Sequence, residues 1–397
     1  MKQATTEDTA DQHRIATIDI LRGLVIVIMA LDHTREFTNA SGWAFNPLSA
    51  EDSTPLLYAT RWITHLCAPA FVLLAGVSAR LQSTRLSRGA LATRLITRGL
   101  WLIVLELTLI GFAWSFSIPY LQFLQVIWAI GWSMILLAAL VWMPPIVSLL
   151  IGAAIIATTS FVVQAQAEAF ADMPALWAVL YRGVGFIPSP ENAWALVAYP
   201  IIPWFGVMAL GYGLGAIFAS PKRTAWLLLL GGAMIAAFLA LRLPNLYGNL
   251  RDWEPASSAF WTFAAIMDVN KNPPVLHFVL ITLGLVFVLM PALERLPKPI
   301  AGFFQTFGAV PLMAYVAHIA TMHLYAIGVR LIAGADLTPM FDTMRTFIFA
   351  SERFGDFSLP IGYVYLVWFA VIATIYPLCR YWQRVKRRRK DWWLSYM

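Results

Sequence analysis

Residues 18–37 read IDILRGLVIVIMALDHTREF, an apolar stretch with charged residues at its two ends. A membrane span needs about 20 mostly apolar residues, and this stretch has that length. Charged ends of a membrane helix often do no more than reach the lipid headgroups, which is the structural reading of Asp19, Arg22, Asp32 and Arg35. His33 lies at the same boundary, and histidine suits proton transfer because its charge changes near neutral pH. The stretch therefore predicts a membrane helix that also carries chemistry.

The composition of the whole chain is that of a membrane protein. Of its 397 residues, 60% are hydrophobic and 12% are charged, and the mean hydropathy is +0.70. Soluble domains are about 45–50% apolar and about 25% charged, so an ordinary soluble domain is excluded. The net charge of +7 does not indicate nucleic-acid binding, because the basic residues cluster between apolar segments and in the tail 384–390. Two cysteines are too few for a disulfide framework.

Ten apolar segments of span length follow one another along the chain. They predict an all-α, polytopic helical bundle that forms a single domain over residues 1–397, with a polar tail (1–14) and a basic tail (384–397). Lys and Arg gather in the short loops that share a side with these tails, so the positive-inside rule places both termini in the cytoplasm. The ten segments centre near Val27, Phe71, Leu105, Met134, Ile155, Met208, Ile235, Leu283, His318 and Phe369.

The first span carries candidate functional residues at both of its ends. Arg22 and His33 lie roughly 16 Å apart along a helix axis, which puts them near opposite membrane boundaries. We expect Arg22 to meet an anionic group from the cytoplasmic side and His33 to act as a base where the reaction ends. Asp32 points about 100° away from His33 on a helix, so it is better placed to pair with Arg35 at i+3 than to orient the histidine.

Titratable residues also lie within the later spans. His65 follows Arg61 by four residues on one helix face, and a polar residue at that depth faces the bundle interior or a wet cavity. An interhelical hydrogen bond is the structural alternative for His65. Glu106 is the most costly single charge in the chain, and it is either an acid or base group or the partner of Arg98, eight residues before it.

The ninth span holds Tyr315 and His318 at i, i+3 on one face, which favours a lined cavity, whereas His323 does not share that face. The sequence contains no HExxH or CxxC motif, so no metal site is predicted. It contains no GxSxG, Walker or dinucleotide fingerprint either.

Five segments together resemble bacterial proteins related to heparan-α-glucosaminide N-acetyltransferase, within the broader group of transmembrane acyltransferases. Arg22 and Gly23 match the family's R-G pair, and His33 falls at the first-helix histidine of the wider group. The lysosomal branch uses a further histidine in its first outer loop, whereas residues 39–49 here contain none. The segments are RIATIDILRGLVIVIMALDHTREF (14–37), HLCAPAFVLLAGVSARL (65–81), YPIIPWFGVMALGYGLG (199–215), KNPPVLHFVLITLG (271–284) and FGAVPLMAYVAHIATMHLY (307–325).

The resemblance implies an acyltransferase of the bacterial inner membrane. It would take an acetyl or other acyl group from cytoplasmic acyl-CoA, with acetyl-CoA as the expected donor, and pass it to a sugar or lipid-linked glycan on the opposite side. Because the loop histidine is missing, direct O- or N-transfer is simpler than an acyl-enzyme route. Membrane lipids are further partners, and a homodimer is compatible with the resemblance. The candidate residues are His33, His65 and Asp32 for catalysis, Arg22, Arg94 and Arg98 for the donor, and Arg35, Arg61, Glu106, Lys271, Tyr315 and His318 for the acceptor.

Two alternatives stay open at this point. A proton-coupled transporter or a lipid or glycan flippase would use Glu106, His65 and His318 as a proton relay. Such folds often contain inverted repeats with broken helices, and no matched pair of interrupted spans is visible in the sequence. A purely structural membrane scaffold leaves the intramembrane His and Glu residues without a role.

Overall fold

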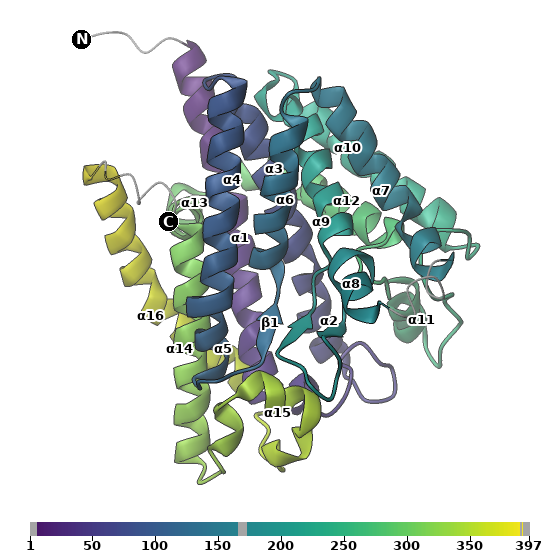
Figure 1. The fold of residues 1–397 in the computed structure, drawn as a ribbon, viewed down its shortest axis with the longest axis vertical. Coiled ribbons are helices and arrows are strands. Elements are labelled where there is room, and N and C mark those ends of the chain that lie inside the picture. The colour runs from purple at the N-terminus through teal and green to yellow at the C-terminus, as the bar shows by residue number, and fades with distance from the viewer. Residues whose placement is uncertain (1–5, 166–172, 390, 392–397) are drawn as a thin grey trace.

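The apolar segments form long helices that run side by side in the computed structural model (Figure 1), which describes residues 6–165, 173–389 and 391. Each of the ten predicted spans is helical. They correspond to α1 (Thr6–Thr38), α3 (Cys67–Gln82), α4 (Arg88–Leu105), α6 (Val126–Leu140), α7 (Pro145–Ala165), α9 (Ile201–Leu214), α10 (Arg223–Arg242), α12 (Leu276–Leu293), α14 (Pro311–Ile332) and α16 (Ile361–Arg388).

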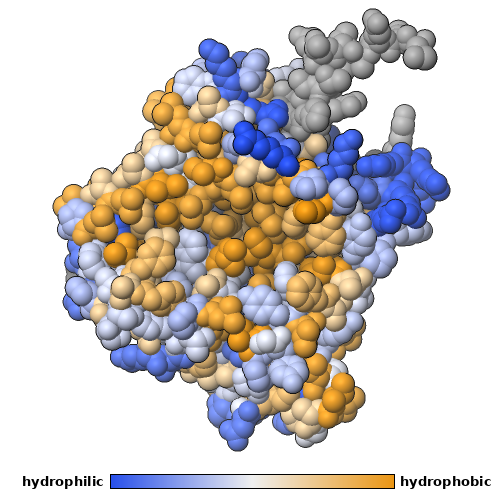
Figure 2. All heavy atoms as spheres, turned by 180° about the vertical axis from the view of Figure 1, so that it is seen from behind, coloured by the Kyte–Doolittle hydropathy of each residue, from blue (hydrophilic) through white to orange (hydrophobic). Residues whose placement is uncertain are grey.

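The described residues contain eight helical runs that are long and apolar enough to cross a membrane. Helix α6 is a shorter apolar helix, and α1 carries charges near both ends of its apolar stretch. Apolar side chains spread broadly over the surface seen in Figure 2, as expected for helices that face hydrocarbon. The predicted all-α, polytopic membrane bundle is thus confirmed.

Shorter elements extend or join these helices. Helix α2 (Pro55–Ile63) continues through η2 (Thr64–Leu66) into α3, and α4 continues through the π-helical η3 (Glu106–Ile110) into α5 (Gly111–Ser115). Capping side chains mark two of the starts, since Thr54 accepts the backbone N–H of Leu57 and Ser87 accepts that of Ala90. The remaining short helices are η1 (Ala40–Gly42), α8 (Pro174–Trp177), η4 (Ala178–Arg182), η5 (Ile217–Ala219), α11 (Ala259–Ile266), α13 (Lys298–Gly308), η6 (Thr338–Met340), α15 (Thr343–Phe349) and η7 (Ser351–Phe354).

A small three-stranded sheet was not predicted. Its strands are β1 (Gln122–Leu124), β2 (Gly185–Ile187) and β3 (Ala195–Val197), in the order β1-β3-β2. Strand β1 pairs in parallel with β3, with Phe123 opposite Leu196, and β2 pairs with β3 in antiparallel fashion. Since β1 leads directly into α6 and β3 leads towards α9, the sheet fixes where these two helices begin.

Helix α1 packs against α3, α12, α13, α14 and α16. The contact with α13 is backbone to backbone, because a Cβ on Gly23 would lie 1.8 Å from the Phe304 carbonyl oxygen and one on Gly308 would lie 1.8 Å from the Asp19 carbonyl oxygen. Gly23 of the R-G pair is therefore required for packing. Helix α13 was not among the predicted spans.

The bundle has two ends, a tail end and a loop end. The tail end holds the first turns of α1 and the last turns of α16, and the opposite loop end holds η6, α15 and η7 (Figure 1). Much of the predicted polar tail 1–14 forms the start of α1, and α16 takes up part of the basic tail 384–397. Residues 1–5, 390 and 392–397 of these tails lie outside the described residues.

Candidate functional site

A large cavity opens between α1, α3, α4, α6, α14 and α16, with a volume of about 420 Å³. We call it the basic cavity, because four cations line it together with Asp19: Arg22, Arg94, Arg98 and Lys386. Arg94 lies in the first half of α4, and Lys386 lies in the last turn of α16. Deeper in the bundle the lining turns apolar, and it includes Leu95, Leu102, Ile127, Ile130, Met134 and Leu312.

Arg22 is held against α3 inside the basic cavity. Its Nη1 lies 3.2 Å from Asp19 Oδ1, and its Nη2 donates to the Ser78 hydroxyl and, at 3.5 Å, to the Leu74 carbonyl. Lys386, from the last helix, donates to the Ala309 carbonyl at 3.3 Å. Residues from both ends of the chain thus form one basic mouth.

A second, smaller cavity of about 30 Å³ lies beyond the basic cavity, and we call it the histidine chamber. Its volume is enough for one or two water-sized groups. Phe71, Val126 and Tyr315 line both cavities, so the two adjoin at these side chains. The other residues of the chamber are Met29, Asp32, His33, Thr64, Cys67, Ala68, Gln125, Tyr199 and Lys271. Helix α1 therefore forms part of the wall of both cavities.

His33 is paired with His318 in the buried interior. His33 Nδ1 lies 2.9 Å from His318 Nε2, and His318 Nδ1 lies 3.1 Å from the Ala314 carbonyl oxygen. A carbonyl oxygen only accepts, so His318 carries its proton on Nδ1 and its Nε2 must accept from His33 Nδ1. With one proton per ring, this chain leaves the lone pair of His33 on Nε2. The rings of His33 and Trp114 pack in a T-shaped arrangement, with centroids 4.9 Å apart.

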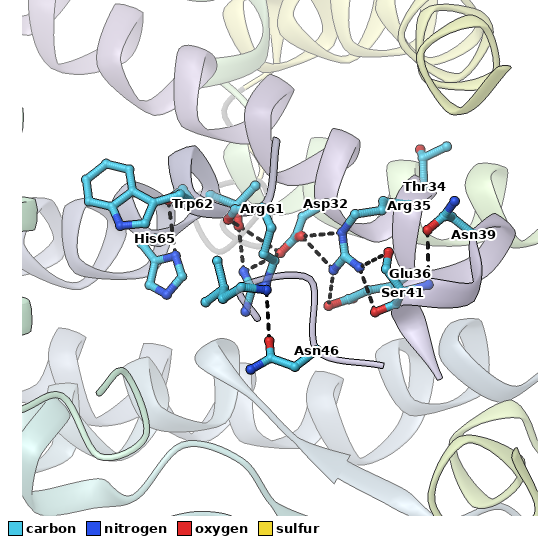
Figure 3. A network of polar contacts seen from close by, with 12 residues as sticks. Asp32, Thr34, Arg35, Glu36, Asn39, Ser41, Asn46, Arg61, Trp62 and His65 are labelled. Atoms are coloured by element: carbon cyan, nitrogen blue, oxygen red, sulfur yellow. Dashed lines mark hydrogen bonds and ion pairs between the residues drawn. The ribbon is translucent and has the colours of Figure 1, made fainter. Parts of the chain in front are cut away.

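Asp32 lies between the guanidinium groups of Arg35 and Arg61 (Figure 3), and no hydrogen bond among the described residues joins it to His33 or His318. Arg35 Nη2 lies 3.0 Å from its Oδ1, Arg61 Nη1 lies 3.1 Å from its Oδ2, and the Thr64 hydroxyl donates to Oδ2 at 3.0 Å. Arg35 also donates to the Ser41 carbonyl at 3.0 Å. The pairing of Asp32 with Arg35 follows the i, i+3 spacing, and both arginines are directed at Asp32.

His65 was a candidate for catalysis beside His33, but it lines neither cavity. Its Nδ1 lies 3.1 Å from the Trp62 carbonyl oxygen, and its ring packs against Trp62 and Phe278. The reason is local, because η2 is a 3₁₀ turn in which successive side chains point about 120° apart. Thr64 reaches Asp32, and His65 therefore turns away from it.

Glu106 also lies outside both cavities. Its Oε1 accepts the backbone N–H of Gln125 at 3.0 Å, and no ion pair joins it to Arg98 within the part of the chain that the structure describes. Arg98 lines the basic cavity. The alternative in which Glu106 pairs with Arg98 is therefore not found, and the carboxyl group, which was a candidate for the acceptor site, instead accepts at the start of α6.

Of the remaining predicted residues, Tyr315 and Lys271 line the histidine chamber, and His318 reaches it through His33. Lys271 Nζ lies 5.4 Å above the ring of Tyr199. Phe71, Gln125 and Tyr199 also line the chamber and were not predicted as site residues. Gln125 directly precedes α6, and that position at the start of a predicted span was the signal that could have identified it. Among the described residues, no cluster of three His, Cys, Asp or Glu side chains could hold a metal ion.

Comparison with known proteins bears on the same region. The sequence model of the family described as heparan-alpha-glucosaminide N-acetyltransferase, catalytic, matches residues 14–242, which run from α1 to the end of α10. No match was found among curated proteins. The matched region includes His33, Arg22, Arg94 and Arg98, whereas His318 and Lys386 follow it. The chain belongs to the heparan-alpha-glucosaminide N-acetyltransferase catalytic family, a family of membrane acetyltransferases.

Proposed function

We propose that the protein transfers an acetyl group from acetyl-CoA to a hydroxyl or amine of a sugar or glycan on the other side of the membrane. The observation that carries this proposal is the junction of the two cavities at Phe71, Val126 and Tyr315. A donor in the basic cavity would bring its thioester to the same place that an acceptor reaches from the histidine chamber. The tail end would then face the cytoplasm of a bacterial cell, as the distribution of basic residues predicts.

The basic cavity suits acyl-CoA in both charge and shape. CoA carries several phosphate charges on one end of a long, weakly polar arm. Arg22, Arg94, Arg98 and Lys386 would hold the phosphates at the mouth, since guanidinium groups bind phosphate oxygens in bidentate fashion. The apolar inner wall would take the arm. The chamber of about 30 Å³ favours an acetyl group over longer acyl chains.

His33 would act as the general base from its free Nε2. The acceptor O–H or N–H gives its proton to this nitrogen while the acceptor atom attacks the thioester carbon. His318 holds the Nδ1–H of His33 and so fixes which nitrogen is basic. A general base accelerates such a reaction by roughly 10²–10⁴-fold. Holding donor and acceptor together lowers the activation free energy by about 7–11 kcal/mol.

The acceptor would enter from the loop end. Lys271 and Tyr199 offer a cation and a phenol ring in the chamber, and Tyr315 offers a hydroxyl. Arg35 and Arg61 would act indirectly, by holding the Asp32 carboxylate in the chamber wall. Since residues before and after position 242 line the same cavities, we take residues 1–397 as a single domain.

A transporter or flippase is the weaker alternative. Its relay requires His65, Glu106 and His318 to form a connected chain. Each of the three instead bonds to a different partner, namely the Trp62 carbonyl, the Gln125 backbone N–H, and His33 with the Ala314 carbonyl. No hydrogen bond among the described residues links one of them to another.

Thioester turnover tests the proposal. Purified protein in lipid nanodiscs, given acetyl-CoA and a panel of sugars and lipid-linked glycans, should release free thiol only with a competent acceptor. His33→Ala should abolish this release while leaving CoA binding intact. His65→Ala is the matched control, because His65 lies outside both cavities. Wild-type protein that binds no acyl-CoA and instead moves a solute or lipid across the bilayer would overturn the proposal.

A further inference from the structure

Gln125 carries a carboxamide whose placement the fold and the proposed base do not explain. Only 6% of the residue is exposed, the residue lines the histidine chamber, and its Nε2 makes no hydrogen bond to any described residue. An amide donor that is buried without a partner is costly, and native structures tolerate one mainly where something else satisfies it. The chamber is the space from which such a partner can come.

We propose that Gln125 is a further catalytic residue, which donates its side-chain N–H to the thioester carbonyl oxygen as that oxygen becomes an oxyanion. The inference rests on the proposed acetyl transfer and adds to it the group that stabilises the developing charge. Gln125 and His33 line the same chamber of about 30 Å³, so a group held there lies against both residues. The next residue, Val126, stands at the junction with the basic cavity, where the thioester would arrive.

The backbone of Gln125 is fixed from two sides. It stands between β1 and α6, and β1 is held in register by β3, with Leu124 opposite Val197. Its backbone N–H donates to Glu106 Oε1 at 3.0 Å. Glu106 lies in η3, where the π-helical turn interrupts the α-helical ladder of α4 and α5. Glu106, the buried carboxyl group that contributes to neither cavity, is thereby a positioning residue for Gln125.

The step requires only the acceptor, the thioester, His33 and Gln125. The acceptor O–H gives its proton to His33 Nε2, and its oxygen forms a bond to the thioester carbon. The carbonyl π electrons move onto the carbonyl oxygen, which accepts the Gln125 N–H. When the carbonyl re-forms, the C–S bond breaks, and the thiolate takes the proton back from His33. The products are an acetyl ester and CoA with a free thiol.

Substitution of the carboxamide tests the inference. Gln125→Met keeps the length of the side chain and removes the donor, and Gln125→Asn withdraws the donor by one methylene. Loss of a single oxyanion donor lowers kcat by about 10²–10³-fold, so we expect kcat of Gln125→Met to fall by that factor. Its KM for acetyl-CoA should change little. Its affinity for CoA should also change little, because CoA has no carbonyl group at sulfur. For Gln125→Asn we expect at least a tenfold loss of kcat.

Gln122→Met is the matched control, because the Gln122 amide donates to the Leu107 carbonyl at 2.8 Å and lines neither cavity. It should retain the wild-type kcat. Glu106→Gln keeps an acceptor for the Gln125 backbone and should retain most of kcat, whereas Glu106→Leu should lose kcat with an unchanged CoA affinity. CoA binding also reports that each variant is folded.

The outcomes separate this inference from the function on which it rests. If wild-type protein turns over no acetyl-CoA with any acceptor, the acetyl transfer itself is wrong. If wild-type protein is active and folded Gln125→Met keeps its kcat, only the role of Gln125 is wrong. Should Gln125→Met fail to fold, an unchanged kcat in Gln125→Asn overturns the inference equally.

Discussion

His33 Nδ1 and His318 Nε2 lie 2.9 Å apart, although the two residues are separated by 285 positions in the sequence. The pair joins α1, which the family model matches, to α14, which lies beyond the matched region. Since His318 can only accept through Nε2 once its Nδ1 is bonded to Ala314, the later half of the chain determines the tautomer of the proposed base.

The first prediction concerns this pair. His318→Gln keeps a side-chain acceptor for His33 and should retain a measurable fraction of activity. His318→Leu leaves the His33 Nδ1–H without a partner and frees the ring to change tautomer. A buried unpaired donor costs roughly 1–3 kcal/mol, so we expect kcat/KM of this variant to fall by about 10–100-fold. Steady-state rates of thiol release measure both variants. Equal losses in the two would show that His318 does not act through its acceptor.

The second prediction concerns the cations at the tail end. Arg94→Gln and Arg98→Gln each remove a phosphate contact, so KM for acetyl-CoA should rise by about tenfold or more, since hydrogen bonds to charged groups contribute about 1.5–3 kcal/mol. The rise should shrink at high salt for a contact near solvent. Arg88→Gln is the control, because Arg88 lies on the same helix, is exposed and lines neither the basic cavity nor the histidine chamber.

A comparison of donors sharpens this measurement. One of these arginines should contact the 3′-phosphate of CoA. The variant that lacks it should no longer prefer acetyl-CoA over 3′-dephospho-acetyl-CoA. The other variants should keep that preference. If Arg88→Gln raises KM as strongly as Arg94→Gln and Arg98→Gln do, the effect comes from the general charge of the tail end and not from the basic cavity.

The third prediction concerns the length of the acyl chain. Phe71 lines both cavities, and removing its ring should enlarge the histidine chamber of about 30 Å³. Phe71→Ala should therefore raise kcat/KM for butyryl-CoA relative to acetyl-CoA, and the ratio is measured within one preparation. Phe112→Ala is the control, since Phe112 is 41% exposed and lines neither cavity. An unchanged ratio in Phe71→Ala would mean that another side chain limits the donor.

The fourth prediction concerns the crossing of α1 and α13. Gly23→Ala places a methyl group 1.8 Å from the Phe304 carbonyl oxygen. Because the backbone must move to relieve this clash, we expect the free energy of unfolding to fall by about 1–3 kcal/mol or more. Gly302→Ala lies on α13 with nothing within 4 Å of the new methyl group, and it should be neutral or more stable by about 0.5–1 kcal/mol. Thermal unfolding in the same detergent compares the two.

The sequence predicted those features that depend on local spacing. Hydropathy located ten helices, and the i, i+3 rule anticipated that Arg35 would pair with Asp32. Contacts between distant segments were not accessible in this way. No spacing rule links His33 to His318, and the orientation of His65 depends on a 3₁₀ turn that hydropathy does not reveal.

Glu106 and Gln125 illustrate the same limit for polar residues. A single buried carboxyl group on a span is expected to pair with a cation, and Arg98 was the nearest candidate along the helix. The actual partner is a backbone N–H at the start of another helix, 19 residues away, which depends on the unpredicted strand β1. A sequence pattern identifies which side chains are costly to bury, but the fold determines which group satisfies them.

The central claim is that the basic cavity and the histidine chamber form one passage along α1. An electron cryo-microscopy map of the protein with bound acetyl-CoA tests it most directly. We expect the phosphates among Arg22, Arg94, Arg98 and Lys386, and the thioester carbon at Phe71, Val126 and Tyr315, with room for an acceptor atom roughly 3–3.5 Å from that carbon on the His33 side. A map with the phosphates at the loop end, or with His33 separated from the thioester by packed side chains, would contradict the claim.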